Sequence, residues 1–156
     1  MLQYHPMTEE EKYAIAAWRY EGEYALYNTP PYEEDKKAGR GFAHPRFVGF
    51  SFFDGEALIG FTTLYEEETE VMLGIGVAPA YCGQGYGRQM IAATCGLAAD
   101  RYPGKRLYLE VRTWNKRAVR CYEKQASASR ARRLLKERAW AKACFIGWSG
   151  KNKKGE

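Results

Sequence analysis

The sequence predicts a single α/β domain, and three observations support that class. The chain has 156 residues, a length that fits one ordinary domain. Hydrophobic residues make up 46% of it and charged residues 28%, which allows a packed core and excludes disorder. Helical patterns, three successive strand patterns and one strand–loop–helix–strand–helix unit follow one another without an internal repeat.

The N-terminal part is predicted to be mostly helical. Residues 2–5 fit a short strand. Thr8 and Glu11 have the spacing of a capping box, which predicts that a helix begins there. Helical spacing continues to about Tyr27, and residues 32–37 fit a further short helix.

The middle part is predicted to be an antiparallel meander. Residues 46–53 are rich in β-branched and aromatic side chains, and Asp54-Gly55 predicts a two-residue hairpin loop. Residues 57–64 and 70–77 fit the next two strands, with an acidic turn at 66–68 between them.

A glycine-rich loop at residues 83–87 follows the meander and leads into a predicted helix over 87–100. Glycines before a helix let backbone N–H groups bind an anion such as a phosphate. The dinucleotide fingerprint is excluded because Arg88 stands where its third glycine belongs, and no Gly-Lys-Ser/Thr follows for a P-loop. Residues 106–111 then fit a strand and 115–124 a helix.

Composition excludes several other classes. No apolar run approaches the roughly 18 residues that a membrane-spanning helix needs, and residues 1–12 lack the apolar core of a signal peptide. The four cysteines show no paired spacing and the two histidines lie far apart. We therefore expect no metal site, reduced thiols and a cytoplasmic protein.

The net charge of +5 is unevenly distributed. Residues 125–156 hold nine basic and two acidic residues, whereas residues 1–124 hold 15 basic and 17 acidic residues. Basicity is thus confined to the C-terminal segment, and we do not expect a nucleic-acid partner.

The segment 77–87, VAPAYCGQGYG, resembles the acetyl-CoA signature Arg/Gln-x-x-Gly-x-Gly/Ala of the GCN5-related N-acetyltransferases (GNAT). Residues 73–79 resemble the family's fourth strand, and residues 109–124 resemble its fifth strand and fourth helix. The resemblance covers residues 1–124. It departs at Cys82, where the first signature position is usually Arg or Gln.

The resemblance implies the acyl-CoA N-acyltransferase fold, in which helices flank a mixed sheet with an antiparallel meander and splayed strands 4 and 5. It also implies acetyl-CoA as cosubstrate. The residues expected to contact the coenzyme lie on the fourth strand, the glycine loop and the fourth helix: Ile75, Gly76, Val77, Cys82, Gly83, Gln84, Gly85, Tyr86, Gly87, Arg88, Asn115 and Ala118.

Two glycines in the fourth strand also fit this role. Gly74 and Gly76 alternate with apolar residues and leave one strand face bare, so that the pantetheine arm can approach the backbone. An amide near residues 75–77 would then polarise the thioester carbonyl. A simple β-bulge is the alternative explanation of the two glycines.

The resemblance suggests an acid and a base. Tyr122 matches the tyrosine that protonates the leaving thiolate, and Glu110 is the first candidate for the base that deprotonates the amine. The Glu110-to-Tyr122 stretch also resembles ribosomal-protein N-terminal alanine acetyltransferases. Glu68 and Glu70 are alternative bases, and Tyr122 as a packing residue is the alternative to its acid role.

An aromatic stripe precedes residue 30. Trp18, Arg19, Tyr20, Tyr24 and Tyr27 fall where the family's first helices wall the acceptor pocket. Helical spacing of aromatic residues is more typical of a core, which is the interpretation we favour for them.

The segment 125–156 departs from the family. The expected Gly-Phe and the two last strands are missing, and residues 134–144 have helical propensity. Codon degeneracy allows a coding sequence in which one frame change restores Ala-Gly-Phe after Lys124, so a frameshift is our hypothesis for this atypical basic tail. A divergent basic helix is the alternative.

The sequence thus predicts an N-acetyltransferase that moves the acetyl group of acetyl-CoA directly to a primary amine of a small molecule or a protein. A catalytically weak acyl-CoA-binding module is the alternative, because the sequence lacks the pattern of the last strands. The sequence does not identify the amine, and a homodimer stays open.

Overall fold

The structure is a computed structural model that describes residues 2–112, 114–128, 132–135 and 140–145. In these residues seven strands form one sheet in the order β1-β2-β3-β4-β5-β7-β6. The elements are β1 (Gln3–Pro6), α1 (Glu9–Ala16), the 3-10 helix η1 (Gly22–Tyr27), α2 (Tyr32–Ala38), η2 (Gly41–Ala43), β2 (Phe47–Asp54), β3 (Ala57–Glu66), β4 (Glu70–Val77), η3 (Pro79–Tyr81), α3 (Tyr86–Arg101), β5 (Arg106–Arg112), α4 (Lys116–Ala128), β6 (Arg132–Leu135) and β7 (Trp140–Phe145).

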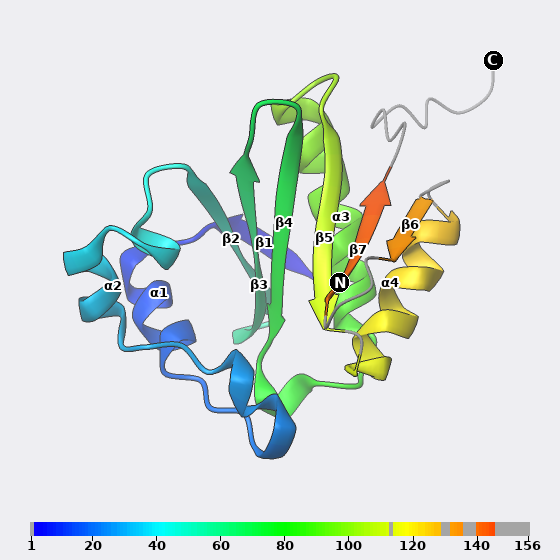
Figure 1. The fold of residues 1–156 in the computed structure, drawn as a ribbon. Helices are drawn as coiled ribbons and strands as arrows, with labels where there is room; N and C mark the ends of the chain where they lie inside the picture. The colour runs from blue at the N-terminus through cyan, green and yellow to red at the C-terminus, as the bar shows by residue number, and fades with distance from the viewer. Residues whose placement is uncertain (1, 113, 129–131, 136–139, 146–156) are drawn as a thin grey trace.

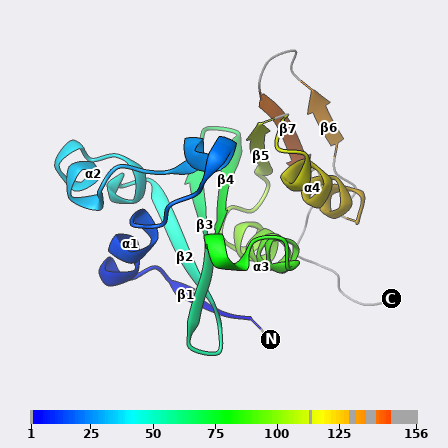
Figure 2. The ribbon, with the colours of Figure 1, turned by 90° about the horizontal axis from the view of Figure 1, so that it is seen from below.

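Helices cover both faces of the sheet. Figure 2 shows α1 and α2 on one face and α3 and α4 on the other. The arrangement is the three-layer α/β architecture that the sequence predicts. No helix in the described part of the chain is long and apolar enough to cross a membrane.

Strands β2, β3 and β4 form the predicted antiparallel meander, with one shift in a hairpin, and β1 pairs antiparallel with β2. Asp54 pairs with Ala57, so the loop residues are Gly55 and Glu56, not Asp54-Gly55 as expected. Gly55 has a φ of 60°, in the left-handed region that glycine adopts without strain. Because this residue must start the loop, β2 extends one residue further than predicted.

Strands β4 and β5 are parallel but pair over only a short stretch. The register joins Glu70–Met72 to Arg106–Tyr108, and the described residues show no pairing between the two strands beyond it. The strands diverge toward their carboxyl ends (Figure 1). The expected splay of strands 4 and 5 is therefore confirmed, and it leaves one edge of β4 without a neighbouring strand over residues 73–77.

The main core lies between the sheet and α3. Phe52, Ile59 and Leu64 from the sheet and Met90 and Ile91 from α3 are fully buried. Burying side chains of this size contributes about 1.5–3 kcal/mol each. This packing fixes the start of α3 relative to β4.

Helix α3 also contacts β3 closely. A Cβ on Gly60 would lie 2.6 Å from the Met90 side chain and 2.8 Å from the carbonyl oxygen of Gly76. The hydroxyl of Thr94 bonds that of Thr62 at 2.9 Å, so the buried polar groups here are paired. A glycine in β3 is thus required by the close approach of the helix and the neighbouring strand.

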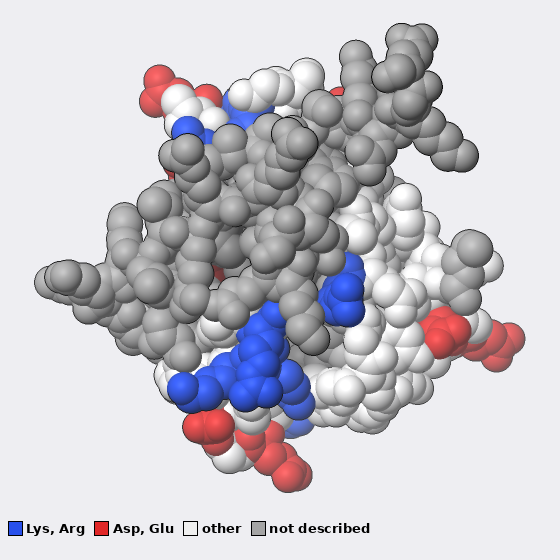
Figure 3. Space-filling view, turned by 90° about the vertical axis from the view of Figure 1, so that its right-hand side faces the viewer, with Lys and Arg blue, Asp and Glu red and all other residues white. Residues whose placement is uncertain are grey.

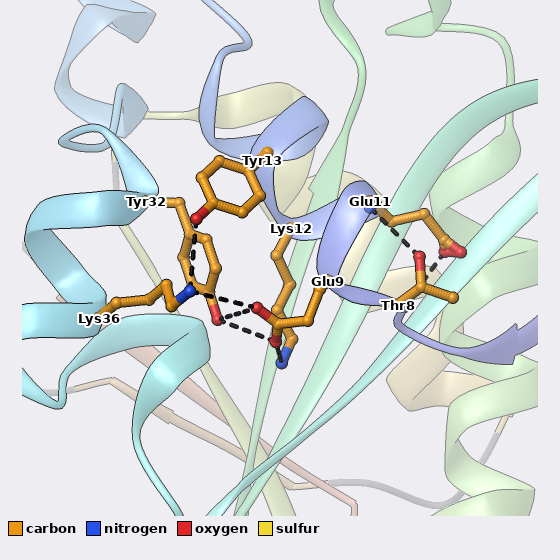
Figure 4. A network of polar contacts seen from close by, with 7 residues as sticks. All are labelled: Thr8, Glu9, Glu11, Lys12, Tyr13, Tyr32 and Lys36. Atoms are coloured by element: carbon orange, nitrogen blue, oxygen red, sulfur yellow. Dashed lines mark hydrogen bonds and ion pairs between the residues drawn. The ribbon is translucent and has the colours of Figure 1, made fainter.

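A polar network joins α1 to α2 (Figure 4). Tyr32 donates its hydroxyl to Glu9 at 3.1 Å, and Lys12 binds the same carboxylate at 2.8 Å. Lys36 donates to the hydroxyl of Tyr13, and the Tyr13 ring packs edge-on against Tyr32. The predicted capping box at the start of α1 is also present. These contacts hold the two helices as one unit on their face of the sheet.

The C-terminal segment forms strands where we expected a helix. β7 pairs antiparallel with β5: Leu107 lies opposite Phe145 at one end of the ladder, and Arg112 lies opposite Trp140 at the other. β6 pairs with β7 in turn. The backbone groups on the outer edge of β5 need a partner, and this demand overrides the local helical propensity. The fit of the side chains in residues 125–156 lies outside the described part, so the frameshift hypothesis and the boundary at 124 stay predictions.

Candidate functional site

A cavity of about 850 Å³ opens where β4 and β5 diverge. One side of it is formed by β4 from Leu73 to Val77 and by the glycine loop up to Arg88. The other side is formed by β5, the first two turns of α4 and aromatic residues from the segments around α1, η1 and η2. The splay of the sheet therefore creates the space in which two molecules can meet.

The glycine loop is shaped for an anion. Gly83 and Gly85 have φ values of 77° and 84°, which other residues adopt only with strain. Gly85 is the N-cap of α3 and provides no side chain to bond the helix amides. The first N–H groups of a helix have no partner within it, so they are available to a phosphate.

Basic side chains surround this end of the cavity. The Arg117 guanidinium lies over the loop, 3.9 Å from where a Cβ of Gly83 would stand, and packs on the ring of Tyr24 at 5.1 Å. Arg88 and Arg120 also line the cavity. Figure 3 shows Lys and Arg side chains gathered at the lower end of this face, where α4 begins.

Two of these arginines were not predicted as coenzyme-binding residues from the sequence. Arg117 and Arg120 are three residues apart, a spacing that places them on one helix face directly after Asn115. That spacing next to a glycine loop is the signal that could have identified them. Together with Arg88 they give this end of the cavity the charge that a polyphosphate requires.

The glycines of β4 are not bare, which corrects our expectation. A Cβ on Gly74 would lie 2.4 Å from the Thr63 hydroxyl, and one on Gly76 would lie 2.3 Å from the Phe61 ring. The register explains this, because Thr63 and Phe61 pair with Gly74 and Gly76 across the antiparallel ladder. The open feature of β4 is therefore its edge toward β5, not its face.

Tyr122 lines the cavity from α4, where Cys121 and Tyr27 are its neighbours. Burial raises the pKa of the Tyr122 phenol well above its usual range, and the adjacent Cys121 and Tyr27 raise it further. The phenol therefore stays protonated at neutral pH, which is the state that an acid requires.

Glu110 lines the cavity from β5. Its neighbours Leu109 and Val111 are buried in the core, so alternation turns Glu110 to the opposite face, where it is exposed. Among the described residues that line the cavity it is the single carboxylate. Glu68 and Glu70 do not line it, because they lie at the other end of β4.

Asn115 joins two parts of the site. Its side-chain oxygen accepts the N–H of Ala118 at 3.3 Å and thereby caps α4. Its side-chain nitrogen donates to the Tyr27 hydroxyl at 3.0 Å and thereby holds η1 against α4. Asn115 is 7% exposed, so both bonds are shielded from water.

The aromatic stripe forms a wall of the cavity, which corrects the core interpretation. Trp18, Tyr20 and Tyr27 are half-buried and line the cavity, as does Tyr24. Tyr20 donates to the Val77 carbonyl at 2.6 Å. Arg19 does not line the cavity, and its guanidinium donates to the backbone carbonyls of Ala16 and Trp18.

Two further aromatic residues complete this wall. Phe42 from η2 packs edge-on against Phe61 from β3 with centroids 5.1 Å apart, and Trp18 lies 6.1 Å from the same ring. The sequence did not identify Phe42 and Phe61 as site residues, because they lie on separate elements and share no local pattern.

The predicted coenzyme residues line the cavity with one exception. Gln84 is exposed, bonds the Ala80 carbonyl at 3.2 Å and does not line the cavity. The Cys82 thiol makes weak hydrogen bonds to the carbonyls of Val77 and Ala78 at 3.6 and 3.5 Å. It therefore fixes the loop to the end of β4, although it cannot bind phosphate as Arg would.

Solved structures share this fold. A chimera of the spermidine N-acetyltransferase SpeG from Vibrio cholerae and hSSAT has a TM-score of 0.74 at 19% identity over 97% of this chain and 99% of that chain. The ribosomal-protein-S18-alanine N-acetyltransferase from Escherichia coli has a TM-score of 0.63 at 19% identity over 92% and 90%. A domain from Methanocaldococcus jannaschii has a TM-score of 0.71 at 13% identity over 92% and 97%.

The sequence comparisons identify the family. The search of curated proteins found no match. The family model described as acetyltransferase (GNAT) family matches residues 12–126, which is most of the chain. The chain therefore belongs to the GNAT acetyltransferase family, and it is an acetyl-CoA-dependent N-acetyltransferase that transfers an acetyl group to an amine.

Proposed function

We propose that this chain acetylates a primary amine by direct transfer, with Tyr122 as the acid and Glu110 as the base. The observation that carries the proposal is that one cavity holds both side chains together with the glycine loop and the open edge of β4. An acyl donor and an amine can therefore meet there without a covalent enzyme intermediate.

The residues present fit the coenzyme. The loop offers unpaired helix amides, Gly85 has no atom within 4 Å of where a Cβ would stand, and Arg117 lies over Gly83. We assign the pyrophosphate to residues 82–88 and the pantetheine arm to the edge of β4 at Ile75–Val77. Asn115 and Ala118 would border the arm from α4.

Each end of the reaction needs one proton transfer. Glu110 is exposed to water in the cavity, so it can accept the ammonium proton directly or through one water molecule. Tyr122 has a raised pKa and retains its proton, so it can donate to the thiolate that leaves. Loss of one such group typically costs about 10²–10⁴-fold in rate.

The acceptor is a primary amine of a small molecule or of a protein. The spacing of Glu110 and Tyr122 resembles that in ribosomal-protein N-terminal alanine acetyltransferases, and we propose these as the nearest relatives in motif. The E. coli enzyme named above shares 19% identity with this chain.

The alternative, a weak acyl-CoA-binding module, rested on the absence of the last strands. β7 and β6 pair beside β5, so that reason no longer holds. We also propose a cytoplasmic location, which the scattered spacing of the four cysteines in the sequence favours.

Calorimetry with acetyl-CoA and a thiol-release assay over a panel of amines test the proposal together. We expect binding and turnover in the wild type. Tyr122→Phe should lower kcat while the Kd for acetyl-CoA stays within about threefold, and Glu110→Gln should flatten the rise of rate with pH. Binding without turnover of any amine would restore the weak-module alternative, and wild-type rates in both variants would remove the assigned acid and base.

A further inference from the structure

We propose that the acceptor is a small primary monoamine whose body is apolar, and that the cavity discriminates against a second cationic group on that body. The inference rests on the proposed function and specifies its substrate class. It is carried by the distribution of charge and of aromatic rings around the cavity.

The charged residues that the structure describes in the cavity lining are three arginines and one glutamate. Arg88, Arg117 and Arg120 lie at the end formed by the loop and α4. Glu110 is the one carboxylate that the described residues contribute to the lining. Glu110 must lie close to the reacting nitrogen, because it is the proposed base. A second ammonium group on the acceptor would therefore find no carboxylate of its own among the described residues of the lining.

The acceptor side is walled by ring carbons. Phe42 and Trp18 both pack on the ring of Phe61, with centroid distances of 5.1 and 6.1 Å. All three are half-buried, so each keeps a surface on the cavity. An apolar body gains binding free energy when it buries its surface against such a wall.

Two tyrosines of this wall, Tyr20 and Tyr27, have hydroxyl groups that are bonded to the protein. Tyr20 donates to the Val77 carbonyl at 2.6 Å, and the Tyr27 hydroxyl accepts from Asn115 at 3.0 Å. Their rings therefore contribute apolar surface, while their hydroxyls are already bonded to the protein. A charged group placed against this wall would lose water without gaining an anionic partner, which is unfavourable.

A pair of acceptors that differ only in the distal group tests the inference. Hexylamine and hexamethylenediamine have the same chain, and the diamine adds one ammonium at the far end. We expect kcat/KM to be at least about tenfold higher for hexylamine, and phenethylamine to be accepted as well. Equal values, or a preference for the diamine through the faces of the aromatic rings, would overturn the inference.

A charge placed in the wall supplies the second test. Phe42→Glu should raise kcat/KM for hexamethylenediamine relative to hexylamine by about tenfold, because it provides the missing carboxylate. Phe42→Gln is the matched control, because glutamine has nearly the same shape as glutamate but no charge. It should leave the ratio of kcat/KM for the diamine to that for hexylamine near the wild-type value. Equal ratios in the two variants would show that this wall does not face the distal group, and would count against the inference.

Binding separates this inference from the proposed function. Calorimetric titration of hexylamine and of the diamine into the protein saturated with desulfo-CoA needs no turnover. Turnover of diamines with no preference for monoamines leaves the acetyltransferase assignment intact and removes the inference. Tighter binding of hexylamine with no turnover of either amine removes the catalytic assignment instead, and the selectivity of the cavity remains.

Discussion

Replacement of Gly76 by alanine should disturb the acceptor wall through a single contact. The new Cβ would lie 2.3 Å from one carbon of the Phe61 ring and 2.8 and 3.1 Å from two others. Carbon atoms in ordinary contact are about 3.5 Å apart, so the ring must retreat by about 1.2 Å. Because Trp18 and Phe42 pack on that ring, its retreat moves the wall.

The expected cost is about 1–3 kcal/mol in the free energy of unfolding, the usual range for overpacking a well-filled site. Phe61→Leu removes the ring carbons that clash. In the double variant the two effects should therefore fall short of additivity by at least about 0.5 kcal/mol. Urea denaturation of the wild type, the two single variants and the double variant measures all four values.

The same variant should affect the acceptor more than the coenzyme. We expect Gly76→Ala to raise KM for the amine, and Phe61→Leu to lower it again in the double variant. Additive stabilities, together with an unchanged KM, would show that the Phe61 ring does not lie over Gly76 as described.

Three other predictions concern the loop, a buried thiol and the tail. Gly85→Asp should weaken acetyl-CoA binding by at least about tenfold, because it places a negative charge where we propose that the phosphate binds. Gly104 has a similar φ of 81° and likewise has open space around the position of a Cβ, so Gly104→Asp is the control and should leave the calorimetric affinity unchanged. Equal losses of affinity in the two variants would show that backbone strain alone is responsible. Burial raises the pKa of the Cys95 thiol from 9.0 to about 12. As the pH rises, the unfolded chain therefore loses this proton before the folded chain does. From pH 9 upward the free energy of unfolding should fall because of this group by at most about 1.4 kcal/mol per pH unit. Cys95→Ala should remove this part of the pH dependence, which urea denaturation at several pH values measures. Intact-mass measurement and sequencing of the coding DNA test the frameshift at residues 125–156, and DNA that differs from close relatives by no single-base insertion or deletion would end that hypothesis.

Local patterns were sufficient for the elements that are determined locally. The capping box at Thr8 starts α1, and the left-handed glycines at 83 and 85 shape the loop, because both features depend only on neighbouring residues. The alternation along β5 likewise placed Glu110 on the face opposite the core.

The features that sequence reasoning missed depend on contacts between distant segments. Phe61 fills the space over Gly76 because β3 and β4 are paired in one particular register, which a single sequence does not reveal. Phe42 reaches the same wall from a 3-10 helix with no periodicity. The strands β6 and β7 form against local helical propensity because β5 needs an edge partner.

The unpaired edge of β4 is placed in the middle of the sheet and not at its margin. Sheet margins can add a strand from another molecule, which makes exposed edges a source of aggregation. Here the edge faces a cavity bordered by β5 and α4, with η1 residues closing another side. A slender chain can lie along it, but a second sheet is too wide to enter. The fold thus leaves this edge of β4 accessible to a slender ligand, while a further sheet cannot pair with it.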